Sequence, residues 1–120
     1  MLAKQGLLLP VEFVWLRSYA GREGGEVAVL AGPPESLQGK TALVVDGVLD
    51  RGHTLLRACA LAMERGARAV MSVVAVDKGR PDALLRADHA LFSGVAEFVV
   101  GYGMDDGGQG RGLPYIARVE

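Results

Sequence analysis

The clearest hydrophobic pattern lies in the middle of the chain, between residues 41 and 77. Residues 42–46 and 70–76 are apolar runs with the length and composition of buried strands. Between them, residues 54–65 have helical spacing, and Gly66 follows as a C′ residue. The apolar stripe of this helix would carry Leu55, Leu56, Cys59, Ala62 and Met63. The order strand, helix, strand predicts one right-handed βαβ unit.

Shorter apolar segments on both sides predict further strands. They cover residues 11–16, 26–31, 89–92, 97–102 and 114–119. We expect the first two to form a hairpin beside the central sheet and the last to be an edge strand. Repeated strands with one crossover helix predict an α/β fold with a largely parallel core. At 120 residues, we expect a single domain over residues 1–120.

Polar residues gather where the first central strand gives way to the helix. Asp46 ends that strand, Asp50 follows four residues later, and Gly47 and Gly52 give the turn its backbone freedom. Thr54 is the expected N-cap of the helix. Unpaired N–H groups and the helix dipole favour an anion at such a terminus, so the pattern predicts a phosphate-binding loop.

Composition and charge narrow the function classes. The formal net charge is −1, which is not the footprint of nonspecific nucleic-acid binding. One cysteine allows no internal disulfide and fits a reducing cytoplasm. The apolar run in the first ten residues is too short for a signal peptide or a transmembrane span. His53 and His89 lack neighbours at zinc-ligand spacing, so we expect no zinc site.

The central stretch VVDGVLDRGHTL resembles the phosphoribosyl-pyrophosphate motif of the type I phosphoribosyltransferases. That motif is a hydrophobic strand, two acidic residues, two hydrophobics, an Asp and Thr-Gly-x-Thr. Ser18 and Tyr19 resemble the start of the family's flexible loop, and DKGRP resembles its purine-contacting segment. EFVVGYGMD, followed by an arginine and LPYI, resembles the carboxyl-terminal segment of hypoxanthine-guanine phosphoribosyltransferases. The resemblance implies a phosphoribosyltransferase-type core, a mainly parallel sheet flanked by helices, without the usual first βα unit.

The resemblance also implies a role for each residue of the central loop. Asp46 would contact the ribose hydroxyls, and Asp50 would act as general acid or base near purine N7. The 5′-phosphate would be bound by Gly52, His53 and Thr54. Arg51, next to this group, puts a bulky cation in the loop that would either help bind phosphate or block it.

Later segments would complete the site. By resemblance, Lys78 would donate to the exocyclic oxygen of a 6-oxopurine, Phe98 would stack on the base, and Val99 would contact its edge. Asp105 would help hold Mg²⁺, the implied cofactor, and Arg111 would meet pyrophosphate. Each of these residues also has a purely structural interpretation. Lys78 would then be a surface lysine, Phe98 a core residue and Asp105 part of a solvated loop tip.

Several positions depart from the family pattern. Gly47 stands in place of the second acidic residue, Arg51 in place of a threonine, His53 in place of a basic residue, and Glu97 in place of a lysine. The absent first βα unit would leave a sheet edge or groove to be covered. We therefore expect a homo-oligomer, a dimer or a tetramer. Candidate contact residues are Leu2, Leu7, Leu8, Leu9 and Trp15.

Two functions from different classes follow. The first is an enzyme, a cytoplasmic purine phosphoribosyltransferase that joins phosphoribosyl pyrophosphate to hypoxanthine or guanine. The second is a nucleotide- or phosphate-binding regulatory module, or an oligomer component, with weak or no turnover. Neither would bind nucleic acid or a membrane.

Overall fold

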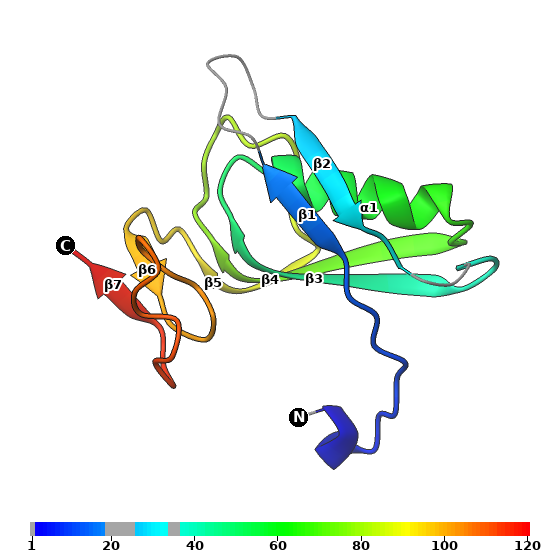
Figure 1. Ribbon diagram of the computed structural model, residues 1–120, viewed down its shortest axis with the longest axis horizontal. Helices are drawn as coiled ribbons and strands as arrows, with labels where there is room; N and C mark the ends of the chain where they lie inside the picture. Colours follow the sequence, from blue (N-terminus) through cyan, green and yellow to red (C-terminus); the bar gives the residue numbers. More distant parts are fainter. Residues whose placement is uncertain (1, 19–25, 34–36) are drawn as a thin grey trace.

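The computed structural model describes residues 2–18, 26–33 and 37–120, and its centre is a three-stranded parallel sheet (Figure 1). The strands are β3 (Thr41–Leu49), β4 (Ala69–Asp77) and β5 (His89–Ser93), in that spatial order. Helix α1 (His53–Glu64) connects β3 to β4. The predicted βαβ unit is therefore confirmed, and both central strands are longer than their apolar runs. In the described part of the chain, no helix is long and apolar enough to cross a membrane.

The core lies between α1 and one face of this sheet. Val44 pairs with Ser72, and Val74 pairs with both Asp46 and Ala90. Strand neighbours in register share a face, so these side chains all lie on the helix side. The buried cluster consists of Leu49, Leu55 and Val74, and Val44, Cys59, Leu85, Ala87 and Ala90 pack against it.

The N-cap of helix α1 lies two residues before the predicted one. The N-cap is Gly52, whose carbonyl accepts the first helical hydrogen bond from the Leu56 N–H at 2.8 Å. The prediction of Thr54 as N-cap was wrong because a glycine with a left-handed backbone made the turn. The other end is as predicted: Gly66 has φ +91° and its N–H donates to the Met63 carbonyl.

Two antiparallel ribbons flank the central sheet. Strands β1 (Trp15–Ser18) and β2 (Val27–Ala31) form the hairpin that the pattern predicted, and α1 contacts both. Residues 11–14 were predicted as strand, but they lie outside it. Strands β6 (Phe98–Val100) and β7 (Ala117–Val119) pair only with each other, so β7 is not an edge strand of the main sheet. A 3₁₀ turn, Leu2–Gln5, precedes the first ribbon.

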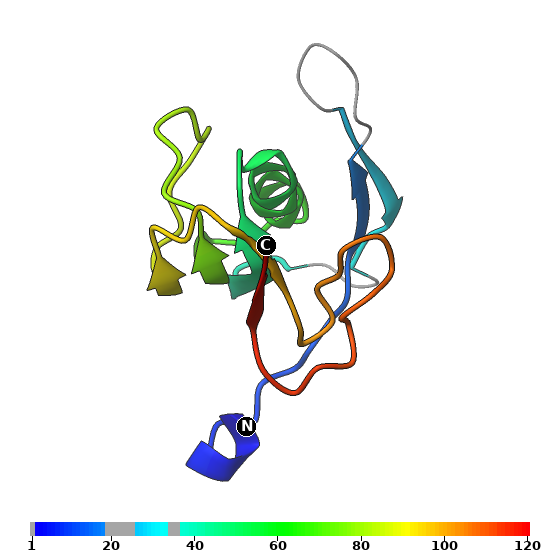
Figure 2. The same cartoon turned by 90° about the vertical axis from the view of Figure 1, so that its left-hand side faces the viewer.

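One face of the parallel sheet is covered and the other is open, as Figure 2 shows with α1 on a single side. Leu43, Val45, Met71 and Leu91 alternate with the helix-facing residues and are exposed, Val45 and Leu91 by 70% and 72%. The resemblance implied flanking helices, whereas the described residues contain one α-helix. The open face is therefore an apolar surface of the isolated chain.

A clip between Ser72 and Asp88 joins β4 to the segment that enters β5. The Asp88 carboxylate accepts hydrogen bonds from the Ser72 N–H (2.7 Å) and hydroxyl (3.0 Å), and the same hydroxyl accepts from the Asp88 N–H. Ser72 is only 3% exposed. The Ser72 N–H and hydroxyl lower the pKa of the Asp88 carboxyl from its ordinary 3.8. The clip is therefore strongest when Asp88 is ionised.

Ser72→Ala is expected to lower the free energy of unfolding by about 1–2 kcal/mol at neutral pH, through loss of the buried hydroxyl's bonds. A depressed folded-state pKa stabilises the fold above 3.8, and that contribution disappears as the pH falls through the folded-state value. Urea titrations of the parent and Ser72→Ala from pH 7 to pH 3 should show their difference shrinking below pH 3.8. A difference that grows on acidification would contradict this account.

Candidate functional site

A cavity of about 230 Å³ opens where β3 runs into α1. Ser18 of β1 forms part of its wall, and the rest comes from the end of β3, the connecting loop and the first turn of α1. Its lining residues are Ser18, Asp46, Val48, Leu49, Asp50, Arg51, Gly52, His53, Thr54 and Leu55. All five residues predicted to bind the phosphoribosyl group are in this set, and so is Asp50, the predicted catalytic residue. Ligands of parallel sheets bind at this position, beyond the carboxyl ends of strands.

The backbone at the bottom of the cavity is suited to an anion. Gly52 has φ +92°, and a Cβ there would collide with the Leu85 side chain. The first helical bond starts at the Leu56 N–H, so the N–H groups of His53, Thr54 and Leu55 precede it. The first turn of α1 carries no acidic side chain, and Gly52 makes no side-chain cap. The positive end of the helix is therefore available to a phosphate.

The two predicted carboxylates have different surroundings. Burial raises the pKa of the Asp46 carboxyl above 3.8, and the hydrogen bond from the Gly47 N–H (2.8 Å) opposes that rise. Asp50 lies half-exposed at the loop. Asp46 is thus a fixed acceptor for hydroxyl groups, and Asp50 is accessible to a proton on a ligand.

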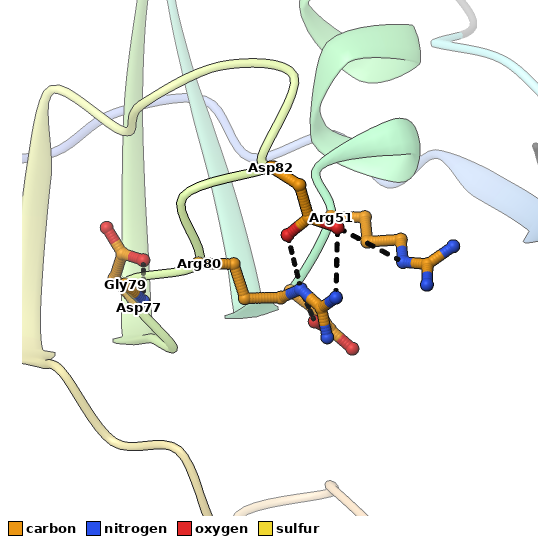
Figure 3. A network of polar contacts seen from close by, with 6 residues as sticks. Arg51, Asp77, Gly79, Arg80 and Asp82 are labelled. Atoms are coloured by element: carbon orange, nitrogen blue, oxygen red, sulfur yellow. Dashed lines mark hydrogen bonds and ion pairs between the residues drawn. The ribbon is translucent and has the colours of Figure 1, made fainter.

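A network of charges made by Arg51, Arg80 and Asp82 (Figure 3) lies beside Asp50, which Arg80 contacts. The Arg80 guanidinium donates to both Asp82 oxygens, at 2.8 and 3.0 Å, and its Nε lies 3.4 Å from Asp50 Oδ1. Arg51 Nε lies 3.9 Å from Asp82 Oδ2. The hydrogen bond and charge of Asp82 raise the pKa of Arg80, and those of Arg80 lower the pKa of Asp82. Arg51 therefore lines the cavity and at the same time forms an ion pair with Asp82.

The predicted purine-binding residues lie together but outside the cavity lining. Lys78 Nζ lies 5.3 Å from the centre of the half-exposed Phe98 ring, a cation–π distance. The Lys78 N–H donates to the Leu49 carbonyl at 3.0 Å, which ties it to the end of β3. Val99 is buried in the β6–β7 ribbon, so the structure does not present its side chain to a ligand. The lysine and the ring thus lie next to the loop that connects β3 to α1.

Asp105 and Arg111 contact each other at the tip of the last ribbon. Arg111 Nη2 lies 2.8 Å from Asp105 Oδ1, and Asp105 Oδ2 accepts from the Gly108 N–H at 2.7 Å. Neither lines the cavity. Residue Met104 next to them faces Gly47, where a Cβ would meet its Cγ at 3.4 Å. The β6–β7 ribbon thus reaches β3 at Gly47, the position where the family motif has its second acidic residue.

The donor set offers no preformed metal cage. Within residues 2–18, 26–33 and 37–120, no three His, Cys, Asp or Glu side chains lie close enough together to hold a metal. Asp105 alone, with both oxygens already bonded, does not form a site. Mg²⁺ commonly takes one or two carboxylates and completes its shell with water and substrate phosphates. Asp105 is therefore suited to a metal ion that enters bound to a phosphate ligand, and not to a metal ion held by the protein alone.

The remaining predictions and omissions are as follows. Ser18 lies on the cavity wall, whereas Tyr19 lies outside the described residues. Sequence reasoning left out Val48, Arg80 and Asp82. Val48 was one of the two hydrophobics of the motif, so its spacing could have identified it. Arg80 lies in the DKGRP segment and Asp82 directly after it, and no spacing in the sequence pointed to either as a neighbour of Asp50. Burial raises the pKa of the Cys59 thiol, with Asp88 adding to it, which fits a packing role.

Comparison with known proteins identifies the family. Residues 3–106 match the phosphoribosyl transferase domain family. The chain is 34% identical over 112 residues to hypoxanthine-guanine phosphoribosyltransferase of Bacillus subtilis, covering 90% of this chain and 62% of the relative. It is likewise 34% identical over 120 residues to the bifunctional protein TilS/HprT of Listeria monocytogenes, covering 97% of this chain and 18% of that protein.

A solved structure agrees with these relatives. The crystal structure of a hypoxanthine phosphoribosyltransferase from Staphylococcus aureus superposes with a TM-score of 0.82 at 30% identity, covering 91% of this chain and 61% of the other. The present chain therefore spans about three fifths of these single-function relatives. The α/β fold with its parallel sheet is the one expected from the sequence. The chain belongs to the phosphoribosyl transferase domain family.

Proposed function

We propose that this chain is a purine phosphoribosyltransferase. It would transfer phosphoribosyl from phosphoribosyl pyrophosphate to hypoxanthine or guanine, giving the nucleotide and pyrophosphate. One observation carries the proposal: a single cavity joins Asp46 and Asp50 to the open N-terminus of α1, beside the pair of Lys78 and Phe98. The relatives named for this activity support the choice of substrate class.

The cavity and the neighbouring pair of Lys78 and Phe98 have chemistry that suits this transfer. N–H groups at the start of α1 bind the 5′-phosphate, and the Thr54 hydroxyl adds a donor. Asp46 accepts from ribose hydroxyls, which fixes the sugar for attack at its anomeric carbon. Asp50 takes or returns the proton at purine N7. Phe98 supplies an aromatic face for the base, and Lys78 donates to its exocyclic oxygen once it leaves the ring face.

Mg²⁺ enters this proposal as part of the pyrophosphate substrate. Bound there, it would neutralise the charge that develops on the leaving pyrophosphate. Asp105 is the protein residue proposed to reach it, directly or through water, and Arg111 is proposed to contact the pyrophosphate. On ligand binding, Asp105 and Arg111 would give up the ion pair that they form with each other and contact the ligand instead.

A second candidate is a nucleotide-binding module with little turnover. It is favoured by the altered motif: Gly47 has no acidic side chain and is packed against Met104, and Arg51 is held by Asp82 in the phosphate loop. Such a module would keep the cradle at Gly52 and lose part of the ribose contacts.

A radiometric assay separates the two candidates. The protein is incubated with Mg²⁺, phosphoribosyl pyrophosphate and labelled hypoxanthine, guanine or adenine, and calorimetry measures IMP and GMP binding in parallel. Product from hypoxanthine or guanine, but not adenine, supports the enzyme. Nucleotide binding without product above the blank supports the module, and neither binding nor product refutes both.

We further propose that the chain assembles as a cytoplasmic homodimer through the open sheet face. Its accessible surface is 8534 Å², against about 6,200 Å² for a compact monomer of this mass. The surplus exceeds the roughly 800 Å² per partner that a stable interface buries. It includes the open face and the exposed side chains of Leu7, Leu8, Leu9 and Trp15. The side chain of Leu2 is outside the description.

Charge on the open face tests the assembly. Val45→Asp and Leu91→Asp each place a carboxylate at a highly exposed position, so the monomer keeps its core while an apolar interface would be opposed. Light scattering after size exclusion should show a two-chain mass for the parent and a one-chain mass for both variants. Met63→Asp, at an exposed apolar position on α1, is the matched control and should leave the mass unchanged. A monomeric parent at 100 µM would rule the interface out.

A further inference from the structure

Four alternating charges form a row along the edge of the phosphate loop. They run Asp50, Arg80, Asp82, Arg51, with contacts of 3.4, 2.8 and 3.9 Å between successive members (Figure 3). Two members belong to the loop after β3 and two to the loop after β4. The row therefore connects the candidate acid–base residue to a segment that the motif does not include.

Backbone hydrogen bonds hold the two loops in register on either side of the row. The Lys78 N–H donates to the Leu49 carbonyl at 3.0 Å, and the Leu84 N–H donates to the Arg51 carbonyl at 2.8 Å. Asp82 lies between these two bonds, so its backbone is held beside the loop that carries Asp50 and Arg51. The geometry of the row is thus a property of the fold and not of long side chains alone.

Arg80 does not share its donors equally. Asp82 receives two bonds from the guanidinium, through Nε and Nη2, in the fork geometry that favours an arginine–carboxylate pair. Asp50 receives only the longer approach of the same Nε. The Asp50 oxygens are consequently left available to a ligand, with a cation close by.

We propose that Asp82 acts as a positioning residue, which holds Arg80 beside Asp50 and prevents it from closing on that carboxylate. The inference rests on the proposed function, because it takes Asp50 as the group that exchanges a proton with the base. Without Asp82, the guanidinium fork is free to pair with Asp50. A purine must then displace Arg80 before Asp50 is available to it.

Kinetics of a double variant test this assignment. Asp82→Ala is expected to raise KM for the base and lower kcat/KM about tenfold, with KM for phosphoribosyl pyrophosphate nearly unchanged. Adding Arg80→Ala removes the competing cation and should restore at least about threefold of that loss, a coupling typical of contacting side chains. Arg57→Gln, which breaks an exposed 2.8 Å arginine–glutamate pair on α1, is the matched control. A purely structural role for Asp82 predicts no recovery in the double variant.

A second readout does not depend on turnover. In ¹H–¹⁵N spectra, the Arg80 Nε–H signal should stay protected from solvent exchange in Asp82→Ala, because Asp50 replaces the lost partner. It should lose protection in Asp82→Ala/Asp50→Asn. Loss of protection in Asp82→Ala alone, or no recovery of kcat/KM in the double variant, overturns the inference. A parent with neither turnover nor nucleotide binding refutes the proposed function instead, and the spectra still decide whether Arg80 closes on Asp50.

Discussion

Asp50→Asn is expected to lower kcat/KM for hypoxanthine by about 10²- to 10⁴-fold, the contribution typical of general acid–base catalysis. The amide has nearly the same shape as the carboxylate and still accepts a hydrogen bond, but it cannot take a proton from purine N7. Because the proposed phosphate site is formed by the backbone of Gly52 and the start of α1, KM for phosphoribosyl pyrophosphate should change little.

Steady-state kinetics with both substrates varied would measure this loss. Glu64→Gln makes the same carboxylate-to-amide change at the far end of α1 and should retain parental activity. Parental kcat/KM in Asp50→Asn would remove Asp50 from the mechanism and leave the cavity as a binding site.

Leu55→Ala is expected to reduce the free energy of unfolding by about 2–5 kcal/mol, the range for deleting a buried leucine side chain. Leu55 is 1% exposed and packs with Leu49 and Val74, so its removal leaves a void between α1 and the sheet. It also lines the cavity at the first turn of α1, so nucleotide affinity should fall with stability.

The neighbouring leucine provides the matched control. Leu56 is 44% exposed, and Leu56→Ala should cost no more than about 1 kcal/mol. Guanidinium titrations of both variants, with equal slopes, would measure the two costs. Equal losses at the two positions would mean that the core does not lie where α1 meets β3 and β4.

The same leucines show where pattern reasoning was sufficient and where it was not. Helical spacing placed Leu55 and Leu56 on one stripe, and it identified the helix and both central strands. The spacing of apolar residues shows which side of a helix is apolar. The width of the sheet that packs on that side determines how many of those residues are buried. The sheet covers Leu55 and Ala62 and leaves Leu56 and Met63 exposed at the margin.

Contacts between distant segments account for the other differences. Glu97 is a negative charge where the family pattern has a lysine. It forms an ion pair with Arg118 on β7, with Arg118 Nη1 2.8 Å from Glu97 Oε1. Arg51 is an unusual cation for a phosphate loop, and Asp82, 31 positions later, shares its charge. No sequence spacing predicts either ion pair. Strand pairing between β6 and β7 brings Arg118 to Glu97, and the loops that follow β3 and β4 bring Asp82 to Arg51.

The sequence by itself determined the βαβ unit, the loop from Asp46 to Thr54 that lines the cavity, and the family to which these motifs belong. Those features depend on neighbours in the chain: strand period, helix period, and a glycine that permits the turn into α1. Only the tertiary structure decided that Lys78 meets Phe98, that Asp105 meets Arg111, and that Arg80 lies between Asp50 and Asp82. The physical reason is that each contact depends on how separate segments come together in space. The parallel sheet brings the ends of β3 and β4 to one edge, which places Arg80 beside Asp50. The β6–β7 ribbon lies outside that sheet, and its position and its own turn bring Phe98 to Lys78 and Asp105 to Arg111.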